Sequence, residues 1–393
     1  MVSASRTRLM ASAVAGQWIF GIILALLGQL FGIPAAMAHA GLDLAAQARL
    51  LLTLFTGQLL FTAIAGRAVD RLGSTHVLAA GSLVMAAAVF LLASGAGFRQ
   101  AMIAAVLMSV GGAAVNAAAN TLVSTVYGDR RGPMLNVLGV FGAAGSVSVP
   151  LAFSGVTTYD QVHTRLLLLA GACALAGVLH LLQPRPTTAG PLAAPRGATR
   201  AALRDPWVLA LMLLLIIDFG NEAVMAGWIA PYTLTAVPEA SATVMVGLYW
   251  SALAAGRLVT PFVLMRTSKL VLLAIASSAA TAGFATISTA RTPFTLGLAV
   301  LLTGLAIAPM APTTLSVAGD RYPKHTGAVF GLLLSLGQLG GMILPWSVAR
   351  VAVTTGFRSG ILVSCAGGVL MTVLLWWLVA RSHRPAAPAG ALQ

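Results

Sequence analysis

Charged side chains are scarce in this 393-residue chain. Lys, Arg, Asp and Glu together make up 8% of it, and only 9 residues are acidic. A soluble domain carries roughly 25% charged residues. With 59% hydrophobic residues, too few polar groups remain to cover a surface that faces water. The sequence therefore excludes a soluble fold and predicts a surface that faces lipid.

Cysteine is nearly absent too. Cys173 and Cys365 both fall within apolar stretches, so we interpret them as small buried side chains and not as disulfide or metal ligands. The six histidines show no metal-ligand spacing, and the sequence contains no Ser/His/Asp set and no phosphate-cradling loop. We therefore expect no cofactor, no metal and no enzymatic activity.

Long apolar runs are what the sequence has in abundance. A membrane-spanning helix needs about 20 apolar residues, and on this measure the chain contains twelve spans. Most linkers are too short for a separate soluble domain. The predicted fold is an all-α integral membrane protein, with spans at residues 14–38, 47–66, 77–96, 101–125, 134–157, 164–182, 207–232, 242–264, 270–290, 295–318, 327–349 and 358–380.

The two halves of the chain repeat each other. Each contains a Gly-Asp-Arg loop followed by three glycines and a proline: Gly128-Asp129-Arg130, Gly132, Gly142, Gly145 and Pro150 in the first, and Gly319-Asp320-Arg321, Gly327, Gly337, Gly340 and Pro345 in the second. A duplicated apolar chain predicts two six-helix bundles related by a pseudo-two-fold axis, as alternating access requires. The predicted parts are an N-terminal bundle (1–182), a Pro- and Arg-rich cytoplasmic linker (183–206), a C-terminal bundle (207–380) and a cytoplasmic tail (381–393).

The 23 basic residues are placed unevenly. With the N-terminus in the cytoplasm, sixteen fall in the predicted inside loops and tails, six fall outside, and Arg257 alone lies within a span. This positive-inside bias predicts cytoplasmic N- and C-termini, and we expect a multi-pass protein of a bacterial inner membrane. The net charge of +14 then reflects membrane topology rather than nucleic-acid binding.

The loop between the second and third spans carries a recognisable motif. From Gly66 to Gly73 it reads Gly-Arg-Ala-Val-Asp-Arg-Leu-Gly, which resembles the loop signature G-x-x-x-D-R-x-G of the major facilitator superfamily. The resemblance implies a secondary transporter built from two six-helix bundles. The corresponding loop of the second half, Met265 to Lys269, has no acid.

This motif is predicted to act as a conformational latch. A carboxylate at the cytoplasmic end of a helix can contact a helix N-terminus or a neighbouring arginine, and breaking that contact would open the inner gate. The alternative is that the acid is simply solvated. The candidate gating residues are Gly66, Asp70, Arg71 and Gly73 with the expected partners Arg130 and Arg131.

A narrower resemblance extends over nearly the full length. The chain resembles the fucose/glucose permease branch of that superfamily in its fourth, fifth, seventh, eighth and eleventh spans, at Asn120-Thr121-Leu122, Arg131-Gly132, Leu135 to Leu138, Phe141-Gly142, Gly145, Gly220-Asn221-Glu222, Trp228, Tyr232, Gly256-Arg257, and Pro323 through Gly331 to Pro345-Trp346. The resemblance implies import of a hexose or deoxyhexose with a proton or Na⁺. That branch often has a fourth-span acid, where this chain has Asn116.

Three charged residues lie deep in predicted spans: Asp218, Glu222 and Arg257. Each costs at least about 2.5 kcal/mol at the bilayer centre, so such residues usually face an internal cavity. Asp218 and Glu222 are four residues apart and share one helical face. We expect one of these two carboxylates to carry the coupling proton, with Arg257 holding its deprotonated form. The alternatives are a static Asp218–Arg257 bridge and a lipid-facing placement.

Solute recognition in such a cavity needs amides and hydroxyls around an aromatic platform. The candidate polar residues near mid-membrane are Gln29, Gln58, Asn116, Asn120, Asn221 and Gln338, and the candidate aromatics are Trp228, Tyr232, Tyr249 and Trp250. Each polar residue could instead make a hydrogen bond between helices, and each aromatic residue could instead serve in packing alone.

The function predicted from these residues is proton-coupled transport of a small polar organic solute, with a sugar-like compound favoured and Na⁺ as an alternative ion. We expect a monomer in the lipid bilayer. A proton-driven exporter of drugs or metabolites on the same fold is the alternative, because the expected lining is largely apolar and Asn116 replaces the fourth-span acid.

Overall fold

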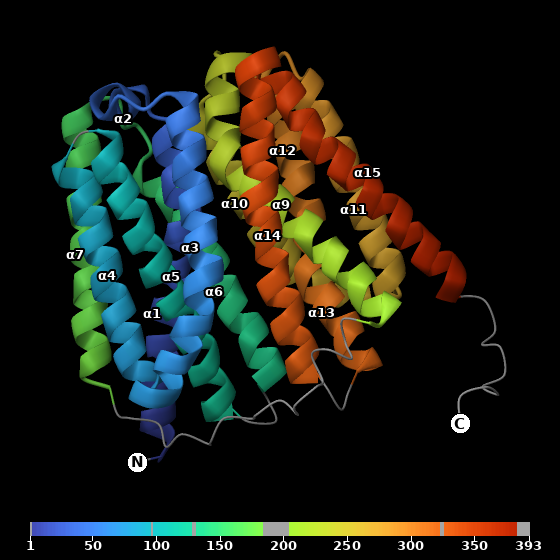
Figure 1. The fold of residues 1–393 in the computed structure, drawn as a ribbon, viewed down its shortest axis with the longest axis horizontal. Helices are drawn as coiled ribbons and strands as arrows, with labels where there is room; N and C mark the ends of the chain where they lie inside the picture. The colour runs from blue at the N-terminus through green and yellow to red at the C-terminus, as the bar shows by residue number, and fades with distance from the viewer. Residues whose placement is uncertain (1, 96, 128–130, 184–203, 323–325, 383–393) are drawn as a thin grey trace.

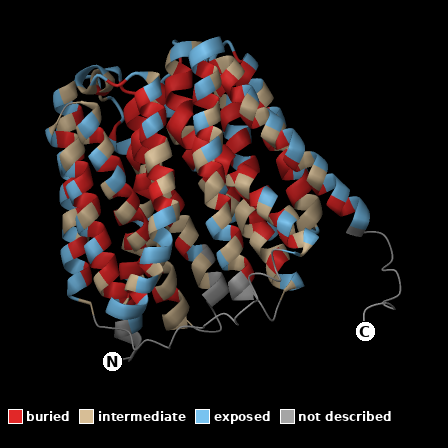
Figure 2. Cartoon of the chain, viewed as in Figure 1, coloured by how far each residue is buried: buried red, intermediate tan, exposed pale blue. Residues whose placement is uncertain are grey.

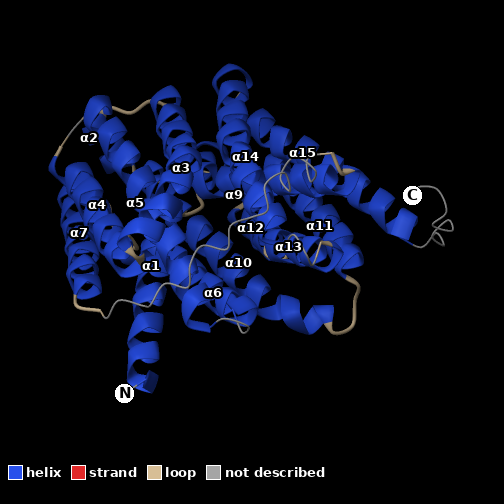
Figure 3. Ribbon diagram, turned by 60° about the horizontal axis from the view of Figure 1, so that its bottom comes forward, coloured by secondary structure: helices blue, strands red, loops and turns tan. Residues whose placement is uncertain are grey.

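The computed structural model describes residues 2–95, 97–127, 131–183, 204–322 and 326–382, and within them every regular element is a helix (Figure 3). The first half contains α1 (Val2–Phe31), α2 (Pro34–Ala40), α3 (Leu44–Leu72), α4 (Ser74–Ser94), α5 (Phe98–Tyr127), α6 (Arg131–Ala152) and α7 (Tyr159–Leu181). The second contains α9 (Pro206–Ala236), α10 (Ala242–Leu264), α11 (Lys269–Thr289), α12 (Pro293–Ile307), α13 (Met310–Arg321), α14 (Thr326–Thr355) and α15 (Phe357–Ser382).

The expected membrane spans are largely present. Within the described residues, eleven helical segments are long and apolar enough to cross a bilayer, while the apolar part of α6, Val137–Ala152, is shorter. The multi-pass, all-helical class is therefore confirmed, and the count of twelve stays a prediction. The limits of the two bundles also stay predictions, because most of the linker and tail lies outside the described residues.

Two proline positions end helices that the sequence predicted to be continuous. The first span was expected to run to residue 38, but α1 ends at Phe31 and Pro34 starts the separate helix α2. The span expected at 295–318 is interrupted at Ala308 and Pro309, between α12 and α13. Proline lacks the N–H of the helical ladder, which contributes to both interruptions. The residue before Pro34, Ile33, is also extended, as proline favours, whereas Ala308 keeps helical dihedral angles.

Polar residues define several helix starts. Asp43, Asp205, Ser241 and Ser268 each accept a hydrogen bond from a backbone N–H two or three residues further on, as N-caps do. The joint between α3 and α4 is different. Gly73 there has a φ of 86°, a conformation that only glycine adopts without strain, so the motif glycine is a requirement of this backbone.

Figure 1 shows α1–α7 gathered on one side of the molecule and α9–α15 on the other, with successive spanning helices running in opposite directions. We call the end at which α7 finishes and α9 begins the linker end, and the opposite end, which carries α2, the far end. Buried residues concentrate between the helices (Figure 2). Large apolar side chains such as Leu168, Phe262 and Val373 are exposed, as expected where lipid is the solvent.

The two halves pack tightly near the far end. A Cβ at Gly28 of α1 would overlap the carbonyl oxygen of Ala226 in α9, and a Cβ at Gly227 would overlap the side chain of Leu51 in α3. A Cβ at Gly32 would lie 2.6 Å from that of Ala230. We call these six residues the far-end seal. Without a hydrophobic force between helices in lipid, such close backbone approach is a main source of packing energy.

The far-end seal predicts a specific sensitivity. Gly28→Ala should force α1 away from α9, because the added methyl meets backbone rather than a movable side chain, and overpacking of this kind costs about 1–3 kcal/mol. We expect a lower Tm in a thermal-shift assay of the purified protein. Gly171→Ala in α7 is the control, since a Cβ there meets nothing within 4 Å and alanine favours a helix. Equal Tm changes for the two variants would contradict the prediction.

Candidate functional site

A cavity of about 420 Å³ lies between the two halves, within the range of about 300–1,000 Å³ typical of small-molecule sites. Helices α1, α3, α5 and α6 line it on one side, and α9, α10, α13 and α14 on the other. Its polar lining residues are Gln17, Gln58, Thr62, Asn116, Ser146, Glu222, Arg257, Ser335 and Gln338, and its aromatic ones are Phe20, Phe55, Phe219 and Trp250.

The cavity reaches toward the linker end. Thr62, ten residues before the end of α3, and Ser335, nine residues after the start of α14, both line it and are exposed. The far-end seal lies on the opposite side of the cavity. The structure thus has one closed end and one accessible end.

An ion pair stands on the cavity wall. Arg257 Nη2 of α10 lies 3.5 Å from Glu222 Oε2 of α9, and the two side chains are 26% and 16% exposed. Among the hydrogen bonds of the described residues, none has the Arg257 guanidinium as donor. The guanidinium offers five N–H donors, so the cavity wall presents an arginine whose hydrogen-bonding capacity is unused by the described side chains.

This pairing differs from the static Asp218–Arg257 bridge, which the sequence left open as an alternative. Helices α9 and α10 are joined at the far end, so depth is measured from that shared turn. Glu222 lies 14 residues before the end of α9 and Arg257 lies 15 residues after the start of α10, which places both roughly 21 to 23 Å from the turn. Asp218 lies one helical turn closer to the linker end and therefore cannot be level with Arg257.

Asp218 sits behind the cavity wall. It is 1% exposed and neither of its carboxylate oxygens has a hydrogen-bond partner among the described residues. The charges of Glu222 and Arg257 both act on it. Asn221 and Tyr249 are likewise fully buried with unpartnered polar atoms in that part of the chain. The three predicted charged residues thus form one group, with Glu222 and Arg257 at the cavity and Asp218 beneath it. Their roles stay predictions.

The predicted solute-binding residues divide into two sets. Gln58, Asn116, Trp250 and Gln338 line the cavity. Asn120 does not, but it donates hydrogen bonds of 2.8 Å to the backbone carbonyl and the side-chain oxygen of Asn116. Asn120 therefore holds a cavity residue in place.

The remaining candidates lie away from the cavity. Trp228 donates to the carbonyl of Pro345 over 2.9 Å and stacks on Phe31, and Tyr232 donates to the carbonyl of Ile287. Gln29 donates to Thr243 Oγ1 over 2.9 Å, from one half of the protein to the other. The Gln29–Thr243 hydrogen bond and the Phe31–Trp228 stack join the two halves, whereas the Tyr232 hydrogen bond lies within the second half. None of the three candidates lines the solute cavity. The buried Asn221 does not line it either.

Sequence reasoning missed part of the lining. Gln17, Phe20, Phe55 and Phe219 belong to the cavity but were not among the candidates. The available signal for Gln17 was a glutamine inside a largely apolar first span, which also contains the candidate Gln29. The phenylalanines gave none, because an apolar ring facing a cavity and one facing lipid look alike in a sequence.

The proposed latch can be followed only in part. Asp70 is exposed near the end of α3, while Arg130 lies outside the described residues and so does the side chain of Arg131. Asp70 and Arg71 have no ion pair among the described residues. In the second half, Lys269 and Asp320 form an exposed ion pair of 2.5 Å at the linker end. The gating role therefore remains a prediction.

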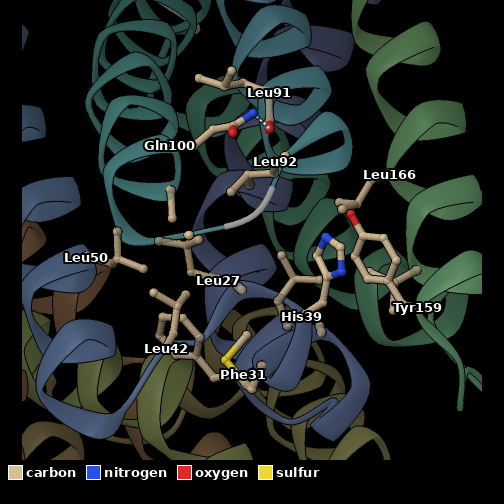
Figure 4. A pocket seen from close by; sticks show the side chains of 18 residues that line it. Leu27, Phe31, His39, Leu42, Leu50, Leu91, Leu92, Gln100, Tyr159 and Leu166 are labelled. Carbon is tan, nitrogen blue, oxygen red and sulfur yellow. Dashed lines mark hydrogen bonds between the residues drawn. The ribbon is translucent and has the colours of Figure 1, made fainter.

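A second, smaller cavity lies at the far end of the first half. It measures about 50 Å³ and is enclosed mainly by apolar side chains, with His39 of α2 stacked on Tyr159 of α7 and Gln100 donating to the carbonyl of Leu91 (Figure 4). It has no Asp, Glu, Lys or Arg in its lining and it does not contact the second half. It lies within the first half beside α2, and it is not the candidate site.

The position of the central cavity can be tested by cysteine labelling. In a Cys173→Ala, Cys365→Ala background, Ser335→Cys should react with a water-soluble maleimide added on the linker side, because Ser335 lines the open cavity. Ser364→Cys is the matched control, since Ser364 is fully buried in α15. Equal labelling of both positions, or labelling of Ser335→Cys only from the far side, would contradict this geometry.

Comparisons with known proteins agree on the fold. A family model described as Major Facilitator Superfamily matches residues 9–345. A gallate transporter of Pseudomonas putida is 29% identical over 198 residues, which is 45% of this chain and 40% of that protein. Two structures of the nucleoside transporter NupG, one of a mutant, superpose with a TM-score of 0.73, at 16% and 17% identity, over 95% or more of this chain and 99% of theirs.

Proposed function

The chain belongs to the major facilitator superfamily, and on this premise we propose that it moves a small polar organic solute by alternating access, coupled to protons. Transport of a small solute through the membrane follows from the family. The proposed proton coupling, the direction of transport and the class of solute are argued from the residues that line the cavity. A site enclosed by both halves, sealed at one end and accessible at the other, is what an alternating-access carrier presents in one of its two states.

The observation that carries the proposal is the group of three charges at the cavity. Intramembrane charges are costly and are retained mainly where they serve a pathway. Glu222 and Arg257 face the cavity while Asp218 lies buried beneath them. Two neighbouring acids in a site of low dielectric disfavour a double negative charge, so one of the carboxylates takes up a proton. That proton travels with the solute and leaves when the site opens to the other side.

Recognition of the solute rests on the polar lining. The amides of Gln17, Gln58, Asn116 and Gln338 surround the cavity, and the ring of Trp250 offers an aromatic face. Amides with an aromatic platform suit a hydroxylated compound, which supports the sugar-like solute and the permease-branch resemblance. The gallate transporter among the relatives supports small organic solutes more broadly.

Topology follows from charge. We assign the linker end to the cytoplasm of a bacterial inner membrane, because the predicted inside loops hold most of the basic residues. The cavity then faces inward. In the opposite state the far-end seal parts and the linker end closes, with the Gly66–Gly73 loop as the latch and Asp70 contacting Arg130 or Arg131.

A second candidate is a proton-driven exporter. It is favoured by the aromatic and aliphatic share of the lining, which includes Phe20, Leu24, Phe55 and Leu334. The direction in which a dye or a sugar moves in vesicles with an imposed pH gradient separates the two.

Proton coupling is tested by neutralising the acids. In proteoliposomes with an imposed pH gradient, the wild-type protein should concentrate its solute, chosen from a thermal-shift screen of sugars, organic acids and dyes at two pH values. Asp218→Asn or Glu222→Gln, or both, should reduce the accumulation ratio to about one, because without a coupled proton the solute only equilibrates.

Glu239→Gln is the control for these variants, since Glu239 is an exposed acid between α9 and α10 and should leave accumulation unchanged. If Asp218→Asn and Glu222→Gln both keep full gradient-driven accumulation, the coupling group has been misidentified.

A further inference from the structure

From the geometry of the Glu222–Arg257 pair we infer that the solute carries a carboxylate, that this carboxylate replaces Glu222 on Arg257, and that it moves with one proton so that no net charge crosses the membrane. The inference rests on the proposed proton-coupled transport of a small polar organic solute, and it specifies a carboxylate in place of the sugar-like compound, together with the stoichiometry.

The first step concerns how weakly the pair is held. Arginine and a carboxylate at their best form two parallel hydrogen bonds at about 2.7–2.9 Å. Here one contact of 3.5 Å joins Nη2 to Oε2, and the guanidinium donates no hydrogen bond to a described residue. Both side chains are partly accessible from the cavity. An incoming carboxylate could therefore make a better bidentate contact with Arg257 than Glu222 does.

The second step concerns charge. The cavity wall carries one cation and one anion, which cancel. A carboxylate that entered beside an ionised Glu222 would leave the site with one uncompensated negative charge, which is costly at low dielectric. Protonation of Glu222 removes that charge. The occupied site then holds Arg257, a neutral Glu222 and the solute carboxylate, and it is neutral again. The cargo is one proton and one carboxylate, whose charges also cancel.

The third step concerns other charges near the Glu222–Arg257 pair that could compete with the solute carboxylate. Asp218 of α9 and Tyr249 of α10 lie near the pair, but both are buried behind the cavity wall. The side chains that α1, α3, α5, α6, α13 and α14 contribute to the lining are uncharged. Arg257 is the single cation of the described lining.

The body of the solute is constrained by the aromatic lining. Phe20, Phe55 and Phe219 come from both halves and, with Trp250, give the cavity flat apolar faces. Such faces favour a planar ring. A suitable probe is therefore 4-hydroxybenzoate, with 4-hydroxybenzamide as a neutral compound of nearly the same shape.

The test measures binding of both probes to the full-length protein in lipid nanodiscs by equilibrium dialysis at pH 6, 7 and 8. Wild type should bind 4-hydroxybenzoate, with an apparent Kd that rises about tenfold per pH unit, as uptake of one proton requires. The amide should bind at least tenfold more weakly at pH 6. Equal binding of acid and amide would overturn the inference.

Variants locate the proton and the carboxylate. Glu222→Gln imitates the protonated acid, so its affinity for 4-hydroxybenzoate should be independent of pH. Arg257→Gln should lose binding, Arg257→Lys should keep part of it, and Arg266→Gln, an exposed arginine beyond α10, should match wild type. A pH dependence that persists in Glu222→Gln but disappears in Asp218→Asn would place the proton on Asp218 and refute the exchange.

Charge movement separates this inference from the proposed function. In proteoliposomes, a pH gradient should drive 4-hydroxybenzoate uptake, and a K⁺/valinomycin potential of either sign should not change it. Uptake that follows the potential overturns the electroneutral exchange. If a pH gradient drives glucose but the protein neither binds nor moves 4-hydroxybenzoate, the inference fails and the proposed function stands. If no pH gradient drives either compound, the proposed function itself fails.

Discussion

The contact between Glu222 and Arg257 is the constraint on which the rest of the site depends. At low dielectric, removing one partner of an ion pair leaves the other charge uncompensated, so under the proposed function a change of charge or partner at one residue requires a response at the other. The level placement of the two residues on α9 and α10, the cavity beside them and the buried Asp218 beneath them make this pair the point where protonation and solute binding can be linked.

Packing between the two halves closes the far end of the cavity in this structure. Glycines at Gly28, Gly32 and Gly227 let the two halves meet backbone to backbone at the far end, and the Phe31–Trp228 stack and the Gln29–Thr243 hydrogen bond lie in the same region. These are small, separable contacts rather than an interlocked core. In the proposed cycle these contacts part when the two halves rock.

The sequence predicted the class, most of the spans and the buried charges, because apolar length, basic-residue placement and isolated acids follow directly from bilayer physics. It did not predict the breaks at Pro34 and Pro309, since prolines also occur inside α9, α10 and α14. It did not decide which of Asp218 and Glu222 contacts Arg257, because depth was counted from the start of α9, whereas the turn between α9 and α10 brings Arg257 level with Glu222. It also named Trp228 and Tyr232 as solute-binding candidates, although neither lines the cavity, because a sequence does not show which way a helix is rotated.

The central claim is that protonation and solute binding are one linked event at Glu222 and Arg257. It is tested most directly by adding saturating solute to the purified protein in a weakly buffered solution near pH 7.5 and recording the pH. The account predicts that about one proton per protein molecule disappears from solution in the wild type and none in Glu222→Gln. A solute that binds the wild type fully without any proton uptake would contradict it.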